Sequence, residues 1–199
     1  MKILVIGAKG TLGKAIVSRL KKRHTVIEAG LSNGSFQVDI SNEESIRSMY
    51  EAVGPIDGVA CAAGRVAFAP FSELTTEELN LGLQNKLLGQ VQLVKIGSEF
   101  ISKNGSFTLI SGILNEDPIY KGTSAAMING ALNSFVSAVS DELREFRINI
   151  VSPTIVEESV EKYDGFFRGF KPTTAAEVAL AYEKSIEGIQ SGKIIRVGY

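Results

Sequence analysis

The stretch from Lys2 to Gly13 most constrains what this chain can fold into. Residues 3–6 read Ile-Leu-Val-Ile, an apolar run rich in β-branched residues that predicts a buried strand. Gly7, Gly10 and Gly13 follow at three-residue spacing, and an apolar periodicity that predicts a helix begins at Thr11. Glycines between a strand and a helix N-terminus let the backbone approach a phosphate, which the free helix N–H groups attract. We predict a nucleotide cradle; the alternative is a tight strand-to-helix turn without a ligand.

Length and charge limit the possible classes. The chain has 199 residues, enough for one domain with a substantial core, and we predict a single domain over 1–199. It carries 21 basic and 22 acidic side chains, which argues against a nucleic-acid or membrane-surface partner. The single cysteine, Cys61, and the absence of a signal peptide or long apolar span predict a cytoplasmic protein. No metal site is predicted.

Strand and helix patterns alternate along the whole chain. The six further predicted strands are 24–29, 36–38, 57–61, 106–110, 147–152 and 193–197. Capping-box pairs open three of the helices between them: Ser41 with Glu44, Thr75 with Glu78, and Thr174 with Glu177. The alternation predicts an α/β, doubly wound Rossmann fold with a parallel sheet of about seven strands and helices on both faces.

The candidate functional residues follow the ends of predicted strands. The glycine turn, Ala62-Ala63-Gly64, Ser111 and Pro153 each come directly after an apolar run. Doubly wound folds bind ligands at the carboxyl ends of their strands. We therefore expect these residues to lie together at one edge of the sheet.

Over essentially its whole length the sequence resembles a short-chain dehydrogenase/reductase, with a Gly-x-x-Gly-x-x-Gly loop close to the family's extended and atypical branches. The motifs that carry the resemblance are Gly7–Gly13, Asp39-Ile40, Cys61–Gly64, Asn85, Ser111 and Val151-Ser152-Pro153. The resemblance implies that the glycine loop holds the diphosphate of a nicotinamide dinucleotide. Asp39 and Ile40 would flank the adenine, Ala62 to Gly64 the adenosine ribose, and Pro153 and Ile155 the nicotinamide. The implied cofactor-binding residues are Gly7, Lys9, Gly10, Thr11, Leu12, Gly13, Ser32, Asp39, Ile40, Ala62, Ala63, Gly64, Asn129, Pro153 and Ile155.

The residues after the second predicted strand bear on the choice of cofactor. The family's acidic position for the ribose hydroxyls aligns with Gly30, so that carboxylate is missing. Lys9 resembles the basic residue that meets a 2′-phosphate in NADP-dependent relatives, and Ser32 adds a hydroxyl. Leu31, where many NADP users carry arginine, and Glu28, about 20 residues beyond the loop, argue for NAD instead. We predict NADP, with NAD as the alternative.

The catalytic pattern of the family is incomplete here. The family uses an asparagine, a serine, a tyrosine and a lysine, and Asn85 and Ser111 stand at the first two positions. Alignment of the following helix puts Ala125 at the tyrosine and Asn129 at the lysine. Alanine has no proton to give, whereas asparagine can still hydrogen-bond ribose hydroxyls but brings no charge. The sequence therefore supports cofactor binding better than turnover.

Three functions remain open. In the first, the protein is an oxidoreductase on a small carbonyl or alcohol, and Tyr120 supplies the proton with Lys121 beside it; Tyr163 is a weaker candidate. In the second, the protein binds NADP(H) without turnover, as a sensor or partner subunit. In the third, the site performs a different reaction, such as proton transfer.

The segment 154–172 and the long helices carry two further expectations. Aromatic residues in 154–172, among them Phe166, Phe167 and Phe170, predict a short apolar lid over the substrate, unless they complete the core. The resemblance implies a homodimer or homotetramer that packs through the helices around 76–100 and 124–146.

Overall fold

A computed structural model describes residues 1–32, 34–163 and 165–199. Its seven strands are β1 Lys2–Ile6, β2 Thr25–Gly30, β3 Phe36–Gln37, β4 Ile56–Cys61, β5 Ile101–Ile110, β6 Arg147–Pro153 and β7 Ile194–Val197. The α-helices are α1 Thr11–Leu20, α2 Glu43–Val53, α3 Thr76–Gly82, α4 Gly89–Gly97, α5 Thr123–Glu142 and α6 Ala175–Glu187. A π-helix, η2, covers Leu83–Leu88, and 3₁₀ turns lie at η1 Phe71–Glu73, η3 Ile113–Asn115, η4 Glu157–Ser159 and η5 Glu161–Tyr163.

The strands form one parallel sheet in the order β3-β2-β1-β4-β5-β6-β7. The predicted α/β, doubly wound Rossmann fold is therefore confirmed. Because β1 lies between β2 and β4, the chain reverses its direction across the sheet at this point, where a ligand crevice opens beyond the strand ends.

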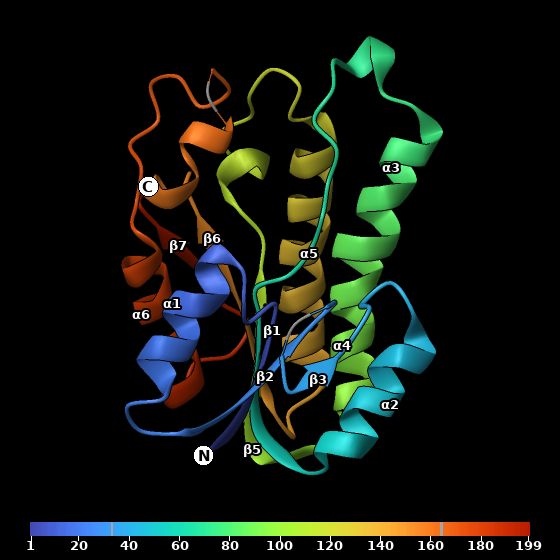
Figure 1. Ribbon diagram of the computed structural model, residues 1–199, viewed down its shortest axis with the longest axis vertical. Helices are drawn as coiled ribbons and strands as arrows, with labels where there is room; N and C mark the ends of the chain where they lie inside the picture. Colours follow the sequence, from blue (N-terminus) through green and yellow to red (C-terminus); the bar gives the residue numbers. More distant parts are fainter. Residues whose placement is uncertain (33, 164) are drawn as a thin grey trace.

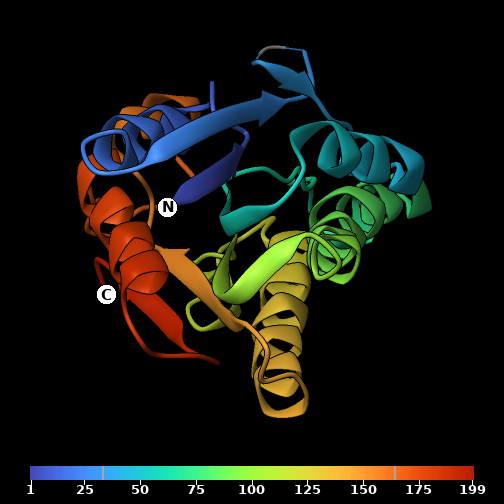
Figure 2. The ribbon, with the colours of Figure 1, turned by 90° about the horizontal axis from the view of Figure 1, so that it is seen from below.

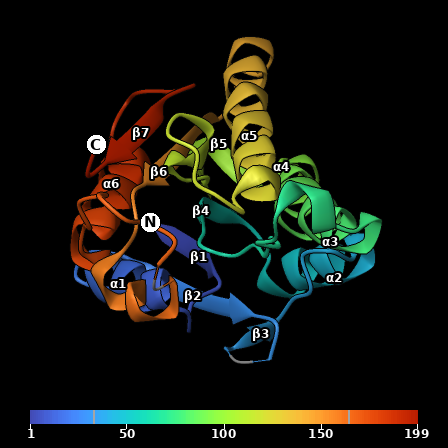
Figure 3. The same cartoon turned by 90° about the horizontal axis from the view of Figure 1, so that it is seen from above.

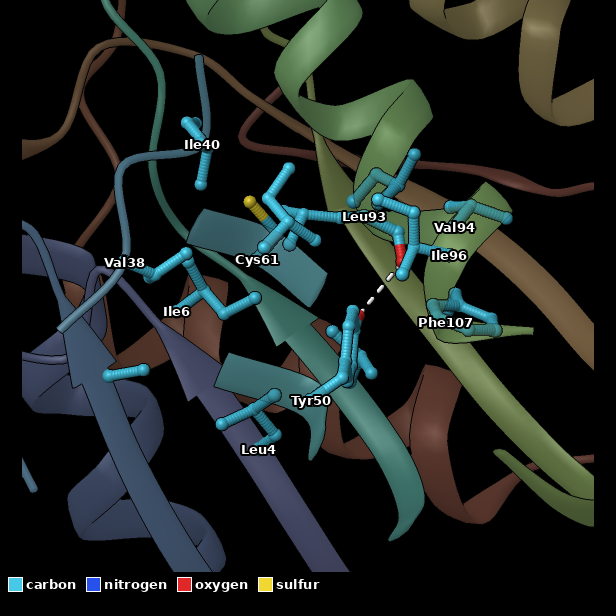
Figure 4. Close-up of a cluster of buried hydrophobic side chains, with 14 of the residues drawn as sticks. Leu4, Ile6, Val38, Ile40, Tyr50, Cys61, Leu93, Val94, Ile96 and Phe107 are labelled. Atoms are coloured by element: carbon cyan, nitrogen blue, oxygen red, sulfur yellow. Dashed lines mark hydrogen bonds between the residues drawn. The ribbon is translucent and has the colours of Figure 1, made fainter. Parts of the chain in front are cut away.

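Helices cover both faces of the sheet. Figures 2 and 3 show α1 and α6 on one side, and α2, α4 and α5 on the other. Apolar strand residues alternate between two buried clusters, so that Ile3 and Val5 face α1 and α6, while Leu4 and Ile6 face the opposite layer. In that second cluster the Tyr50 hydroxyl donates to the Leu93 carbonyl over 2.8 Å (Figure 4). Because the buried Tyr50 hydroxyl makes this hydrogen bond, it holds α2 against α4 without leaving a polar group unsatisfied.

Loops beyond the carboxyl ends of the strands lie at one end of the molecule. Figure 1 shows the segments around 62–75, 112–122, 154–163 and 165–172 above that edge of the sheet. Residues far apart in sequence are thereby brought to one place. Among the described residues, no helix is both long and apolar enough to cross a membrane.

The structure confirms two of the three predicted capping boxes and corrects the third. The capping boxes at Thr75 and Thr174 are confirmed. The box at Ser41 is wrong: Asn42 caps α2 by accepting from the Ser45 N–H, because the Ser41 hydroxyl is bound to Asp39. The helix expected over 76–100 is broken by η2 into α3 and α4.

Candidate active site

The glycine turn is held by its own backbone. Gly7, at φ +80°, accepts a hydrogen bond from the Gly10 N–H over 3.0 Å. A Cβ at Gly13 would lie 2.0 Å from the Gly7 carbonyl oxygen. The first turn of α1 therefore packs directly on the turn, and a side chain at Gly13 would push the two apart.

The N-terminus of α1 is open to an anion. Its N-cap, Gly10, has no side-chain cap, and the first turn, Thr11 to Gly13, carries no acidic residue. The first N–H groups of a helix have no acceptor within the helix and carry partial positive charge. This cradle therefore fits a diphosphate.

A cavity of about 240 Å³ lies beside the turn. Asp39 stands on its wall, where its carboxylate accepts from the Ser41 hydroxyl at 2.6 Å and the Ser41 N–H at 2.9 Å. These bonds hold the pKa of Asp39 below its usual value. The lining residues are Ile6, Gly7, Gly10, Gly30, Leu31, Val38, Asp39, Ile40, Ala62, Ala63, Gly64, Arg65 and Asn85.

A second cavity, of about 520 Å³, opens on the other side of Gly64. Gly64 and Arg65 line both cavities, and Leu12 of α1 lines the larger one, so the two meet beside the helix N-terminus. Two hollows joined at an anion cradle suit a ligand with two bulky ends and a charged centre. The larger cavity is lined by Leu12, Gly64, Arg65, Val66, Phe68, Leu81, Lys86, Ser111, Gly112, Ile113, Leu114, Ala125, Asn129, Pro153, Thr154, Ile155, Val156, Ser159, Lys162, Tyr163 and Phe167.

Charges near the glycine turn form a small cluster. The Glu28 carboxylate pairs with the Lys21 ammonium at 2.6 Å and with Lys9. Lys21 and then Lys9 lower the pKa of Glu28, which therefore stays ionised. The cluster holds one more positive than negative charge, and the Lys9 side chain is 51% exposed. Ser32 follows β2 directly beyond Leu31.

Ser111 and two residues of α5 meet in the larger cavity. Ser111 follows β5, and its Oγ is buried without a hydrogen-bond partner in the described ranges. The Asn129 Nδ2 donates to the Gly112 carbonyl over 3.1 Å, and Ala125 lies one helical turn earlier on α5. A buried hydroxyl without a partner is ready to bond a ligand.

The other predicted catalytic residues lie elsewhere. The Asn85 Oδ1 accepts from the Arg65 N–H over 2.8 Å, and Asn85 lines the smaller cavity. The Tyr120 side chain is 76% exposed and lies outside the lining of both cavities. Tyr163, on η5, does line the larger cavity.

Aromatic rings from 154–172 both wall the cavity and pack inward. Apart from Asp164, which lies outside the described residues, this segment covers one side of the larger cavity through residues such as Ile155 and Phe167. Phe167 and Phe170 also pack against a small buried cluster of Ile113, Leu114 and Ala125. Phe167 thus lines the cavity and also packs inward, while a lid over a substrate stays a prediction.

Sequence reasoning missed Lys86. This residue of η2 lines the larger cavity, and its Nζ donates to Asn129 Oδ1 over 2.8 Å and to the Ser111 carbonyl over 3.1 Å. Burial lowers its pKa to about 8. The missing lysine at position 129 was the available signal, because it raises the question of which other lysine could reach that place.

Gln90 was also missed. Its side-chain amide donates to the Ile110 carbonyl and accepts from the Ile110 N–H, each over 2.9 Å. This buried pair fastens α4 to the end of β5, one residue before Ser111. It thereby fixes the distance between η2 and the serine.

The fold and the joined cavities define a nucleotide-binding doubly wound protein. The family model described as "Enoyl-(Acyl carrier protein) reductase" matches residues 8–190. The chain therefore belongs to the short-chain dehydrogenase/reductase family.

Similar proteins span a wide range of identity. The structure of the protein lin1944 from Listeria innocua is 48% identical, with a TM-score of 0.97 over 99% of both chains. A small-chain dehydrogenase in complex with NADPH is 23% identical, with a TM-score of 0.88 over 99% of this chain and 96% of that one. The short-chain dehydrogenase/reductase ucsE from Acremonium sp is 25% identical over 57% of this chain and 46% of its own length. The match thus spans about half of that curated relative.

Proposed function

We propose that the protein is an NADP(H)-dependent oxidoreductase acting on a small carbonyl or alcohol. The observation that carries this proposal is the pair of cavities that meet at an acid-free helix N-terminus, with the unpartnered Ser111 hydroxyl in the larger one. When bound, the cofactor supplies or accepts a hydride. The chain contributes the diphosphate cradle, an apolar wall and polar groups for the substrate oxygen.

Each part of the dinucleotide has matching residues. The N–H groups of the α1 first turn face the diphosphate, and Asp39 and Ile40 border the adenosine end. Asn129 and Pro153 border the nicotinamide end, while the Ser111 hydroxyl donates to the substrate oxygen. Membership of a family that uses NAD(P) supports this assignment.

The preference for NADP rests on the charges around the adenosine end. Lys9 and Lys21 exceed the single negative charge of Glu28, so a 2′-phosphate can take the exposed Lys9 ammonium as its partner. Comparison of the dissociation constants of NADPH and NADH tests this preference. Tighter binding of NADH, unchanged in Lys9→Ala, would refute it.

Turnover is tested by NADPH oxidation over a panel of ketones, aldehydes and quinones. Ser111→Ala should reduce activity by about 100-fold or more, since it removes a donor aimed at developing charge. Ser106→Ala is the matched control, because Ser106 is a buried serine within β5 whose hydroxyl, like that of Ser111, has no partner in the described residues. If Ser111→Ala retains full activity, the site assignment is wrong.

A silent cofactor-binding protein is the second candidate. It is favoured by Ala125, which offers no proton at the position where the family carries its tyrosine. Micromolar NADPH binding without oxidation of NADPH by any member of the panel would support this alternative.

Assembly as a homodimer or homotetramer is part of the proposal. Leu81, Leu88 and Met127, on α3, η2 and α5, leave 38%, 41% and 46% of their surface exposed, as a helix–helix interface requires. A monomer by light scattering would contradict this assembly.

A further inference from the structure

Lys86 is a cavity lysine without an ion-pair partner. Its two acceptors, Asn129 Oδ1 and the Ser111 carbonyl oxygen, are both neutral. An ammonium carries three N–H donors, so one remains for a ligand. In the part of the chain that the structure describes, Lys86 forms no salt bridge.

The groups around Lys86 leave its charge uncompensated. Arg65 from the segment after β4, and Lys162 and Tyr163 from η5, line the same cavity, and no carboxylate is among the described lining residues. Burial raises the pKa of the Cys61 thiol in β4 to about 12, so this thiol stays neutral. Partial removal of an unpaired ammonium from water costs free energy, and such a group is typical of a functional site.

The Lys86 side chain is also held in place. A Cβ at Gly64 would lie 2.6 Å from Lys86 Cγ and 3.0 Å from its Cβ, so the backbone at Gly64 packs against the lysine stem. The Gln90 amide donates to the Lys86 carbonyl over 3.2 Å and fastens the next turn to β5. The backbone and stem of Lys86 are therefore held in place while its amine reaches the cavity, as a catalytic group requires.

We propose that Lys86 is the proton donor and acceptor of this site, serving the substrate oxygen beside Ser111. The inference rests on the proposed function. In the reductive direction the carbonyl carbon would accept a hydride, which a bound reduced nicotinamide would supply. The C=O π pair would move to oxygen, and Lys86 would donate its ammonium proton to that oxygen. The products are an alcohol, an oxidised nicotinamide and a neutral Lys86 amine, which recovers its proton from water.

The geometry explains why the amine can act here. Lys86 Nζ lies against the Asn129 amide, at the place where the aligned family pattern would put a lysine from α5. Its pKa of about 8 makes the ammonium a better acid than an exposed lysine and keeps it protonated at neutral pH. The reduction rate should therefore fall, and the oxidation rate should rise, as the pH passes through 8.

Lys86→Met is the test variant, because it keeps an unbranched stem as far as Cε and removes the amine. We expect kcat for reduction to drop by about 100- to 10,000-fold, with loss of the titration near pH 8. Lys162→Met is the matched control: it removes an exposed ammonium from the same cavity and should keep the pH profile. Circular dichroism and NADPH binding check that both variants fold.

Direct titration of the amine gives a readout that needs no substrate. With ¹³C- and ¹⁵N-labelled lysine, one side-chain NMR signal should titrate near pH 8 in the cofactor-free protein and vanish in Lys86→Met. A Lys86 signal that titrates above pH 10 would overturn the proposal.

The outcomes separate this inference from the proposed function. An active wild-type protein whose Lys86→Met variant keeps its rate and pH profile refutes the proton transfer alone. A variant that loses only NADPH affinity assigns Lys86 to cofactor binding and also refutes it. If the wild-type protein binds NADPH but none of the tested substrates leads to NADPH oxidation, the proposed function is refuted, and the inference with it.

Discussion

The glycine turn and the larger cavity around Ser111 present different kinds of chemical group to a ligand: backbone groups at the turn and side chains in the cavity. At the turn, backbone N–H groups form the anion cradle and backbone atoms pack closely together. Gly13 fits there only because it lacks a side chain. Around Ser111, the residue that follows β5, side chains from η2 and α5 converge on the same cavity. A backbone site is tied to its place in the chain, whereas a side-chain site needs only that a functional group reach a point in space.

That difference bears on the departure from the family's catalytic pattern that the sequence predicts in the second region. The predicted alignment puts Asn129 where the family carries a lysine, and the Lys86 ammonium lies 2.8 Å from the Asn129 amide oxygen. We therefore expect an ammonium from another position in the sequence to serve this part of the cavity. The following variants test this comparison, in order of decreasing effect.

Gly13→Ala tests the backbone region. The new Cβ would overlap the Gly7 carbonyl oxygen and Ala8, so the turn and α1 must separate. We expect a loss of several kcal/mol in stability and about 100-fold or more in NADPH affinity, measured by thermal unfolding and by titration. Gly130→Ala on α5 is the control, since its Cβ would meet only Asn115 Cβ at 3.7 Å. Equal effects of the two variants would show that the turn has no special need for glycine.

Exchange of Lys86 and Asn129 tests the side-chain region. Lys86→Asn should lower kcat for reduction by about 100-fold or more, and Asn129→Lys should bring two ammonium groups together. The double variant should recover at least about 10-fold over Lys86→Asn, because the ammonium returns to the cavity from the other helix. Strictly additive losses in the kinetic double-mutant cycle would mean that position in sequence matters more than position in space.

The pH dependence of stability tests the partly buried charge of Lys86 without any reaction. The pKa of Lys86 is about 8 when folded and that of a free lysine is near 10.5, so the unfolded chain binds more protons between these values. Stability should rise with pH in this window by at most about 1.4 kcal/mol per pH unit, relative to Lys86→Met. Below pH 8 both states are protonated and the penalty is constant. Denaturant unfolding at pH 7, 8.5 and 10 measures the free energy of unfolding of both proteins. A difference between them that is the same at all three pH values would contradict this prediction.

Lys9→Ala should have the smallest effect on folding. Lys9 is about half exposed and Glu28 keeps Lys21, so stability should change by about 1 kcal/mol or less. NADPH affinity should fall by about 10-fold while NADH affinity stays constant, by isothermal titration. Lys14→Ala, an exposed lysine on α1, should change neither.

Much of the fold could be predicted from the sequence because its signals are local. Runs of β-branched residues predict the central strands, and Thr75 and Thr174 carry complete capping boxes. The start of β5 was missed because Lys103 and Asn104 interrupt the apolar pattern, although Ile101 pairs with Ile56. Pairing between distant strands provides what the local pattern lacks.

The candidate site could be predicted only in part. Ser111 and Asn129 line the larger cavity, in line with their strand-end and helix positions. Lys86 could not be placed, because its direction depends on the π-helix, and the leucine spacing around Leu83 and Leu87 fits an ordinary α-helix equally well. The hydrogen-bond pattern of the helix decides which of its residues face the cavity, and that pattern cannot be seen in the sequence.

The π-helix at Leu83–Leu88 accommodates one residue more than an α-helix would between α3 and α4. Hydrogen bonds from i to i+5 take up an additional residue, while the cap at Thr75 and the buried face of α4 keep their places at either end. Deletion of the exposed Gln84 would therefore allow a continuous α-helix with both ends still packed, but with Lys86 in a different rotation. On the proposal that Lys86 transfers the proton, we expect a one-residue change in length to exchange the reactive group while the rest of the fold is retained.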